Sequence, residues 1–502
     1  MRNIVIIGGG PAGVFAAIEA KRRDGEAEVT LISEEPCEPY ERPPLSKAVL
    51  LGKARAADAP IAGPKGLAGH GVNLKIDTRC TAIDRASQHV VTASGARLPY
   101  DALVIATGSL VRQIPALPYG APHVHYLRTE ADAVALGGEL KAARHLAVIG
   151  GGLIGLEVAA SASELSVPVT VIEVLPRVLA RVCNEETSMR VHEAHRRHGV
   201  DIRVGTALTH AQAEPDGRIA LKLGSGETLI ADLVVVGAGA LPDDRLAAAA
   251  GLKTDQGIVV DARCATSDRK IFAAGDVVRF PAPLGLVRRE DWRHAQDQGA
   301  VAGRNAAGAA EEYRPVPSFW SEQFDLYIQG IGWPPPQSDR QVKRAGPGSS
   351  ELTFDLVGPH ITYALGVNAQ GDIATTRRLI ERRIAVEPHF GRAAPLDHVN
   401  DLLIEVLFGI ERAGTRHLHD VTTPFAFGAV ELDVSPASAQ PAPGRERQIL
   451  HPAHPDVAKD RNAFGFHEQV VGRFWAAELA KTGAPSCRGL VPVSLPGNVM
   501  HG

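Results

Sequence analysis

Two glycine-rich turns are the stretches of this 502-residue sequence whose residue types best suit phosphate binding. One runs from Gly8 to Gly13 and the other from Gly150 to Gly155, and both have the spacing G-x-G-x-x-G. In such a turn the first glycine allows the tight bend, the second lets a pyrophosphate approach the backbone, and the third lets helix and strand pack closely. The candidate binding positions in the two turns are Gly8, Gly10, Pro11, Ala12 and Gly13, then Gly150, Gly152, Ile154 and Gly155.

Each turn lies between a short apolar strand and a helix. The strands at 4–7 and 146–149 show no polar alternation, as expected of parallel strands that are buried on both faces. Helices are expected at 14–22 and 156–164, and each is followed by another apolar strand. Amides and the dipole at a helix start favour the negative charge of phosphate. Two complete βαβ units therefore predict an α/β fold with two Rossmann-like dinucleotide-binding domains.

Acidic residues follow the second strand of each unit. Glu34 and Glu35 come about 20 residues after the first turn, and Glu173 ends the corresponding strand of the second unit. A carboxylate at this position bonds a ribose 2′-hydroxyl and repels the 2′-phosphate of NADPH. We therefore expect the second unit to bind NADH, with NADPH less favoured, although the nearby Arg177 could oppose this preference.

Length and composition bound the remaining classes of protein. The chain is too long for one core, so about three domains are expected. A net charge of −4 gives no reason to expect binding to nucleic acid or to acidic membranes. No apolar run is long enough to cross a bilayer, and no signal peptide fits the N-terminus. Five scattered cysteines suit a cytoplasmic location. The pairs His417/His419 and His451/His454 lack a convincing metal-ligand pattern, so no metal is expected.

The stretch from Pro39 to Lys47, with the pattern P-Y-x-R-P-P-L-S-K, resembles a known family. It is similar to the FAD-dependent NAD(P)H:ferredoxin reductases that serve oxygenases and cytochromes P450, the family of the putidaredoxin, rubredoxin and biphenyl dioxygenase reductases, with apoptosis-inducing factor as a relative. The resemblance implies a glutathione reductase-like fold, with FAD on the first unit and Arg42 and Lys47 against the flavin. The pattern G-G-G-x-I-G-x-E implies that Glu157 pairs with Lys47 near flavin N5. A first-turn carboxylate favoured by the helix dipole is the alternative interpretation of Glu157.

Other segments carry the resemblance further along the chain. They include the strand that ends in A-T-G at 106–108, the Gly-Asp pair at 275–276, the R-x-E segment from Arg289, and V-P-x-F-W-S-x-Q from Val316. The resemblance implies that Trp320 approaches the flavin or nicotinamide, although a core aromatic is the alternative. For Arg128, a solvated arginine at a helix start is nearly as plausible as a cofactor contact. The remaining cofactor-binding candidates are Cys80, Ala106, Thr107, Gly108, Arg128, Gly237, Asp276, Glu290, Asp291 and Trp292.

The expected domains follow these segments. An FAD-binding domain is expected at 1–115 and 245–315, an NAD(H)-binding domain at 116–244, and a C-terminal α+β domain at 316–405. An extension at 406–502, with a Pro/Ala-rich linker at 434–444 and a terminal helix, lies beyond the resemblance. The extension could pack on the parent domain, on a second subunit or on another protein.

The expected activity follows from the two dinucleotide sites. Hydride moves from NADH to flavin N5, and electrons then pass to an iron–sulfur partner, a ferredoxin of an oxygenase or P450 system. One alternative is an NADH oxidase or quinone reductase without a protein acceptor. The other is a reductase subunit whose extension mainly mediates complex assembly.

Overall fold

The computed structural model describes residues 1–283 and 285–386. The predicted extension, its linker, its terminal helix and both histidine pairs lie outside these residues. The first sheet has five parallel strands in the order β19-β7-β1-β2-β3, as the apolar, non-alternating strand at 4–7 predicted. Its strands are β1 (Asn3–Ile7), β2 (Glu28–Ile32), β3 (Asn73–Lys75), β7 (Ala102–Ile105) and β19 (Ile271–Ala273).

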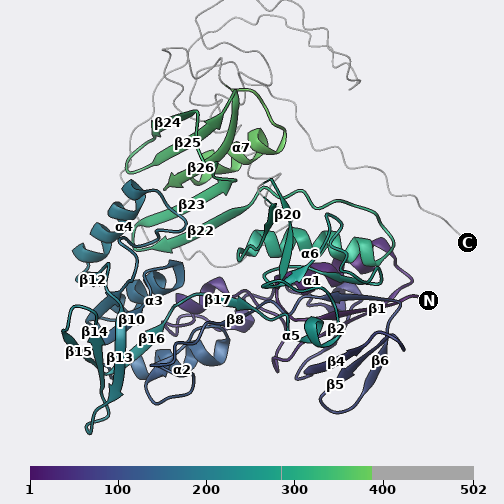
Figure 1. Cartoon of the computed structure of the whole chain (residues 1–502), viewed down its shortest axis with the longest axis horizontal. Helices are drawn as coiled ribbons and strands as arrows, with labels where there is room; N and C mark the ends of the chain where they lie inside the picture. The colour runs from purple at the N-terminus through teal and green to yellow at the C-terminus, as the bar shows by residue number, and fades with distance from the viewer. Residues whose placement is uncertain (284, 387–502) are drawn as a thin grey trace, which may run out of the picture. The chain divides into compact units, whose positions relative to one another are not determined.

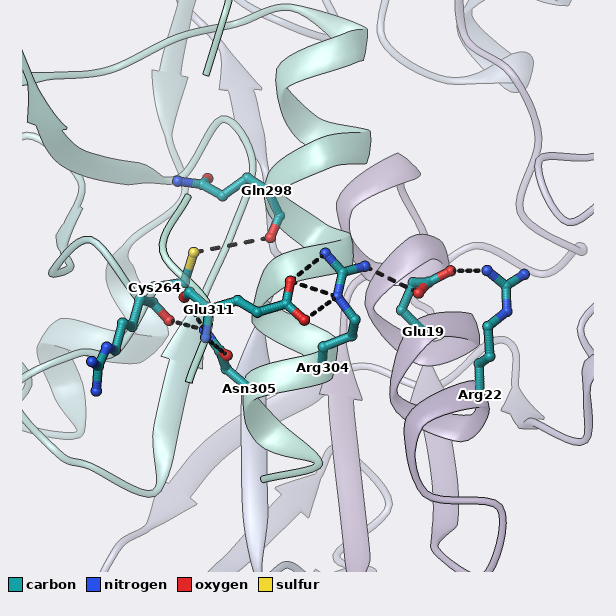
Figure 2. Close-up of polar contacts among 8 residues, drawn as sticks. Glu19, Arg22, Cys264, Gln298, Arg304, Asn305 and Glu311 are labelled. Carbon is teal, nitrogen blue, oxygen red and sulfur yellow. Dashed lines mark hydrogen bonds and ion pairs between the residues drawn. The ribbon is translucent and has the colours of Figure 1, made fainter. Parts of the chain in front are cut away.

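Two helices that are distant in sequence lie side by side on this sheet: α1 (Pro11–Arg23) and α6 (Trp292–Ala306) (Figure 1). Their backbones touch, because a Cβ added at Gly303 would lie 2.1 Å from the carbonyl oxygen of Ala16. Figure 2 shows how Arg304 of α6 joins Glu19 of α1, at 3.0 Å, to Glu311, at 2.8 Å. These contacts fix α6 against α1, the helix that follows the first glycine turn.

The second sheet repeats the first, with five parallel strands in the order β12-β11-β10-β16-β9. It comprises β9 (Val124–His125), β10 (Leu146–Ile149), β11 (Val169–Ile172), β12 (Asp201–Arg203) and β16 (Leu233–Val236). The helices of this part of the chain are α2 (Glu130–Leu140), α3 (Leu153–Glu164) and α4 (Glu185–Arg197), whereas α5 (Arg245–Ala249) packs with the core of the first sheet. All strand residues of β10, β11 and β16 are buried, which accounts for their uninterrupted apolar sequences.

Small antiparallel sheets and short helices fill the connections. The three-stranded sheets are β4 (Cys80–Asp84), β5 (His89–Thr92) and β6 (Arg97–Pro99), and β13 (Leu208–Ala213), β14 (Ile219–Leu223) and β15 (Thr228–Ala231). The other short strands are β8 (Ser109–Val111), β17 (Ala240–Pro242), β18 (Ile258–Val259), β20 (Val278–Ala282) and β21 (Gly285–Val287). The 3₁₀ turns are η1 (Pro43–Ser46), η2 (Ala56–Asp58) and η3 (Ala68–His70).

The last described part is an antiparallel sheet in the order β22-β23-β26-β25-β24, with one helix. Its elements are β22 (Ser318–Gln323), β23 (Leu326–Gly332), β24 (Arg340–Ala345), β25 (Glu351–Val357), β26 (His360–Val367) and α7 (Gln370–Glu381). The alternating stretches at 351–356 and 361–367 are strands, as the sequence predicted. The fold class is therefore confirmed for the described residues, of which no helix is long and apolar enough to span a membrane. The domain limits themselves stay a prediction.

Candidate active site

A cavity of about 1030 Å³ lies at the carboxyl ends of β1 and β7, where open α/β sheets bind ligands. The two Rossmann units and β22 all contribute to its walls. Most of the sequence-predicted site residues meet here. They are Gly8, Gly10, Pro11, Ala12, Glu34, Glu35, Arg42, Lys47, Cys80, Ala106, Thr107, Gly108, Arg128, Ile154, Glu157, Asp276, Glu290, Asp291, Trp292 and Trp320.

The first glycine turn leaves room for a phosphate group above α1. Gly8 has φ +119°, and a Cβ there would lie 2.1 Å from the carbonyl oxygen of Ala106. A Cβ at Gly13 would lie 1.9 Å from the carbonyl oxygen of Gly8, so Gly13 sets the close packing of helix and strand and does not line the cavity. No atom lies within 4 Å of a Cβ placed at Gly10. The cradle therefore fits a pyrophosphate that approaches Gly10.

The two acids after β2 differ in their surroundings. Glu35 accepts hydrogen bonds from the Tyr40 hydroxyl at 2.5 Å and from Arg42 at 2.7 Å. Glu34 is 70% exposed, and its nearest ion-pair partner is Arg79 at 3.7 Å. Because its carboxylate has fewer hydrogen-bond partners, Glu34 is the better candidate for a ribose hydroxyl. Glu35 instead holds Tyr40 and Arg42 in place.

Two guanidinium groups face the same end of the cavity. Arg42 donates to the backbone carbonyl of Arg128, and Arg128 Nη2 lies 3.9 Å from Asp276 Oδ2. Burial lowers the pKa of Arg128, and the neighbouring charge of Arg42 acts in the same direction. Two adjacent, partly desolvated cations gain from a dianionic ligand, so this charge pattern also fits a pyrophosphate.

Lys47 and Glu157 form the ion pair that the family pattern predicted, with 2.7 Å between Nζ and Oε2. Lys47 directly follows η1, whose two prolines fix the backbone, and Glu157 lies on α3. Glu157 also accepts hydrogen bonds from Ser46 at 2.5 Å and Ser321 at 2.7 Å. Three donors thus converge on one buried carboxylate beside the cavity. That the pair acts next to a flavin stays a prediction.

The same helix, α3, carries the second glycine turn, so the two predicted sites share one wall. Ile154 is 51% exposed and lines the cavity from the first turn of α3. The turn repeats the geometry of the first one, since a Cβ at Gly155 would lie 2.1 Å from the carbonyl oxygen of Gly150. The predicted residues Gly150, Gly152, Gly155, Glu173 and Gly237 lie outside the cavity, around this second turn.

Glu173 is buried at the end of β11. Its two carboxylate oxygens accept hydrogen bonds from the backbone amides of Gly151, at 2.6 Å, and Leu175, at 2.7 Å. The charge therefore lies against the glycine turn. Arg177 does not face it as a free cation, because its guanidinium donates to the backbone carbonyls of Cys183, at 2.8 Å, and Ala180, at 3.2 Å.

The segment from Arg289 differs slightly from the prediction. The helix α6 starts at Trp292 rather than at Arg289, because Asp291 is its N-cap and accepts from the His294 amide at 2.8 Å. Burial raises the pKa of Asp291, and Arg289 opposes that shift from 3.0 Å. Trp292 packs edge-to-face with Trp320, their ring centroids 6.1 Å apart. Both indoles line the cavity, and that Trp320 contacts a cofactor ring stays a prediction.

Cysteine chemistry at this site is disfavoured. Cys80 lines the cavity, and burial raises the pKa of its thiol to about 11. Burial also raises the pKa of Cys37, with Glu35 acting in the same direction. Both thiols therefore stay protonated and weakly nucleophilic near pH 7.

The sequence did not point to four residues that bond to Glu157 directly or through one another: Ser46, Ser321, Gln323 and His195. Ser46, Ser321 and Gln323 stand in the motifs P-P-L-S-K and F-W-S-x-Q, which carried the signal, yet only Lys47 and Trp320 were assigned there. His195 had no local signal, because its contact with Gln323 spans 128 positions of the sequence.

Comparisons with known proteins agree with this architecture. Residues 2–299 match the model of the pyridine nucleotide-disulphide oxidoreductases, and residues 318–397 match that of the reductase C-terminal domain. The anthranilate 1,2-dioxygenase system ferredoxin–NAD(+) reductase component of Burkholderia cepacia is 40% identical over 388 residues, 76% of this chain and 95% of the relative. Rhodocoxin reductase of Rhodococcus erythropolis is 36% identical over 77% of this chain and 91% of the relative.

A solved structure has the same arrangement. Putidaredoxin reductase, in its covalent complex with putidaredoxin, superposes with a TM-score of 0.74 and 34% identity, covering 81% of this chain and 99% of the other. The chain belongs to the pyridine nucleotide-disulphide oxidoreductase family, within its group of ferredoxin–NAD reductases. The resemblance inferred from the sequence is thereby confirmed.

Proposed function

We propose that this chain is an FAD-dependent NADH:ferredoxin reductase that supplies electrons to an oxygenase or cytochrome P450 system. The observation that carries the proposal is the shared wall formed by α3. This helix starts at the second dinucleotide turn and presents Ile154 and Glu157 to the cavity of the first. A nicotinamide held by the second turn can therefore reach a ring held in the cavity.

The cavity residues divide into those that hold FAD and those that act at its ring. Gly10 and the amides at the start of α1 would hold the pyrophosphate, together with Arg128 and with Arg42, which the resemblance instead implied to lie against the flavin. Glu34 accepts a ribose hydroxyl. Asp276, which accepts from Ser109 at 2.9 Å and lines the cavity, would hold the ribityl chain. Bound FAD supplies two-electron chemistry with NADH and one-electron chemistry with the acceptor.

The Lys47–Glu157 pair sets the charge at the reacting end of the cavity. An ammonium group fixed in advance by Glu157 would stabilise negative charge that develops on bound FAD, without reorganisation. Ile154 and Trp320 line the cavity, where they would pack against the cofactor rings and exclude water. The carboxylate of Glu157 holds Lys47 in place.

Glu173 favours NADH. Its charge lies against the second turn, where a 2′-phosphate would approach, and Arg177 is engaged by backbone carbonyls. NADPH is therefore the poorer donor.

An iron–sulfur protein is the proposed acceptor. The sequence lacks the C-x-x-x-x-C pair of the disulfide reductases, so bound FAD would transfer electrons directly to the acceptor. Relatives named as ferredoxin–NAD(+) reductases and as rhodocoxin reductase support this class of partner. The five scattered cysteines support a cytoplasmic location. That the extension binds a second copy of the chain or another protein stays a prediction. Truncation at about residue 405 tests it, because a partner bound by the extension would no longer co-purify.

The experiment that tests the proposal compares cytochrome c reduction by NADH with and without an added ferredoxin. A ferredoxin reductase needs the ferredoxin to reach cytochrome c. NADH consumption that is fast in oxygen alone and indifferent to ferredoxin would instead indicate an NADH oxidase or quinone reductase.

A further inference from the structure

A line of buried polar side chains leads away from the cavity, starting at Glu157. Ser321 Oγ lies 2.7 Å from Glu157 Oε1, and Gln323 Nε2 lies 2.9 Å from Ser321 Oγ. Gln323 Oε1 then lies 2.9 Å from His195 Nε2. Ser321 and His195 are 0% exposed and Gln323 is 1% exposed, so water does not compete for these bonds. The line joins α3 and α4 to β22, which is distant from both in the sequence.

The direction of each bond follows from the charge of Glu157. Because Glu157 is paired with Lys47, its carboxylate only accepts, and the hydroxyl of Ser321 must donate to it. A hydroxyl has one proton, so Ser321 Oγ must accept from the amide NH₂ of Gln323. The carbonyl oxygen of Gln323 is then turned toward His195, which must carry its ring proton on Nε2. The ionised carboxylate thus dictates one order of protons along the whole line.

The surroundings of His195 suit this role. Burial lowers its pKa to about 4, so the imidazole is neutral and has a single ring proton at pH 7. Its Nδ1 has no hydrogen-bond partner among the described residues, which leaves Gln323 as the partner that selects the tautomer. The ring also packs edge-on against Phe324 at 4.9 Å, in the turn that joins β22 to β23. Two consecutive residues, Gln323 and Phe324, therefore hold His195.

We propose that Ser321, Gln323 and His195 are positioning residues that fix the carboxylate of Glu157, and through it the ammonium of Lys47, in one orientation. This inference rests on the proposed function, in which Lys47 stabilises the charge that arrives with the hydride. Its consequence is that the C-terminal sheet and α4 set the geometry of the reacting end of the cavity, although neither Gln323 nor His195 lines it.

The first test measures flavin reduction by NADH in an anaerobic stopped-flow experiment. Ser321→Ala should lower the limiting rate constant about tenfold, the size expected when a hydrogen bond to a charged group is lost. Gln323→Met, which removes hydrogen bonds between neutral groups, should lower it about fivefold. FAD content and the half-saturating NADH concentration should change less than about twofold, since neither residue lines the cavity. The control is Ser188→Ala, a buried serine on α4 that donates to the Val178 carbonyl at 2.6 Å. Rates equal to the wild-type rate in both test variants would overturn the proposal.

A double variant separates positioning from general loss of structure. In a Glu157→Gln background, Ser321→Ala should slow reduction by less than about twofold, because the carboxylate that it positions is already gone. A general structural defect would lower the rate again by the full factor. A further tenfold loss in the double variant would therefore contradict the proposal.

The last test does not depend on turnover. In protein labelled with ¹⁵N-histidine, NMR correlation spectra report which ring nitrogen carries the proton, and His195→Gln identifies the signal. The expected result is a neutral imidazole with the proton on Nε2, and a changed tautomer balance in Gln323→Met. A wild-type His195 protonated on Nδ1 would reverse the Gln323 amide and overturn the inference. If NADH failed to reduce the wild-type flavin, the proposed function would fall while this tautomer result stood by itself.

Discussion

Replacing Glu157 with glutamine removes one charge from the centre of the candidate active site and keeps the shape of the side chain. Glu157 accepts from one ammonium and two hydroxyls, at 2.7, 2.5 and 2.7 Å. Breaking a buried pair costs about 3–5 kcal/mol, but Lys47 is 24% exposed and water partly replaces its partner. We therefore expect the free energy of unfolding to fall by about 2 kcal/mol. If the same 2 kcal/mol is lost from the transition state, hydride transfer slows about 30-fold.

The assay is anaerobic stopped-flow reduction of the bound flavin by NADH, with FAD content and a urea titration measured in parallel. Glu164→Gln is the matched control, because Glu164 lies on the same helix and pairs with Lys53 at 2.6 Å. That pair is exposed, so its loss should change stability by less than about 1 kcal/mol and leave the rate unchanged. The reasoning is refuted if Glu157→Gln reduces at the wild-type rate, or if it slows no more than Glu164→Gln.

Three further predictions concern other parts of the site. Because the folded-state pKa of His195 is about 4 against an ordinary 6.5, the unfolded chain binds more protons between these values. Stability from this group is present above pH 6.5 and is lost as the pH falls, by about 2 kcal/mol at pH 5, and urea titrations should show a smaller loss in His195→Gln. Gly13→Ala should prevent folding, because its Cβ would lie 1.9 Å from a carbonyl oxygen, whereas Gly10→Ala should fold normally but purify with less FAD. Glu173→Gln should lower the kcat/KM preference for NADH over NADPH about tenfold, and Arg177→Ala should leave it unchanged; equal preferences in wild type and Glu173→Gln would contradict the role of that carboxylate.

The parts of the fold that the sequence could predict are those with local signals. Each glycine turn, its strand and its helix lie within about 30 residues, so a single unit of sequence contains the whole pattern. The Lys47–Glu157 pair was predictable only from the family pattern, since 110 positions separate its members. The start of α6 could have been predicted correctly, because an aspartate before a helix is a common N-cap, and Asp291 occupies that position.

The rest depends on contacts that no local pattern specifies. Glu34 and Glu35 are equivalent in sequence, and only the Tyr40 and Arg42 contacts of Glu35 separate them. The three hydrogen bonds between Glu157 and His195 join residues that are 164, 2 and 128 positions apart in the sequence. Such contacts arise when β22 packs against α3 and α4, and the pattern of a single sequence does not reveal that packing.

The most direct test of the central claim, that one chain holds both a flavin and a reducing nucleotide on a shared wall, is an anaerobic titration of the purified protein with NADH. The account predicts a yellow protein with about one FAD per chain, which the first equivalent of NADH bleaches. A colourless protein, or a yellow one whose absorbance does not change with excess NADH or NADPH, would contradict it.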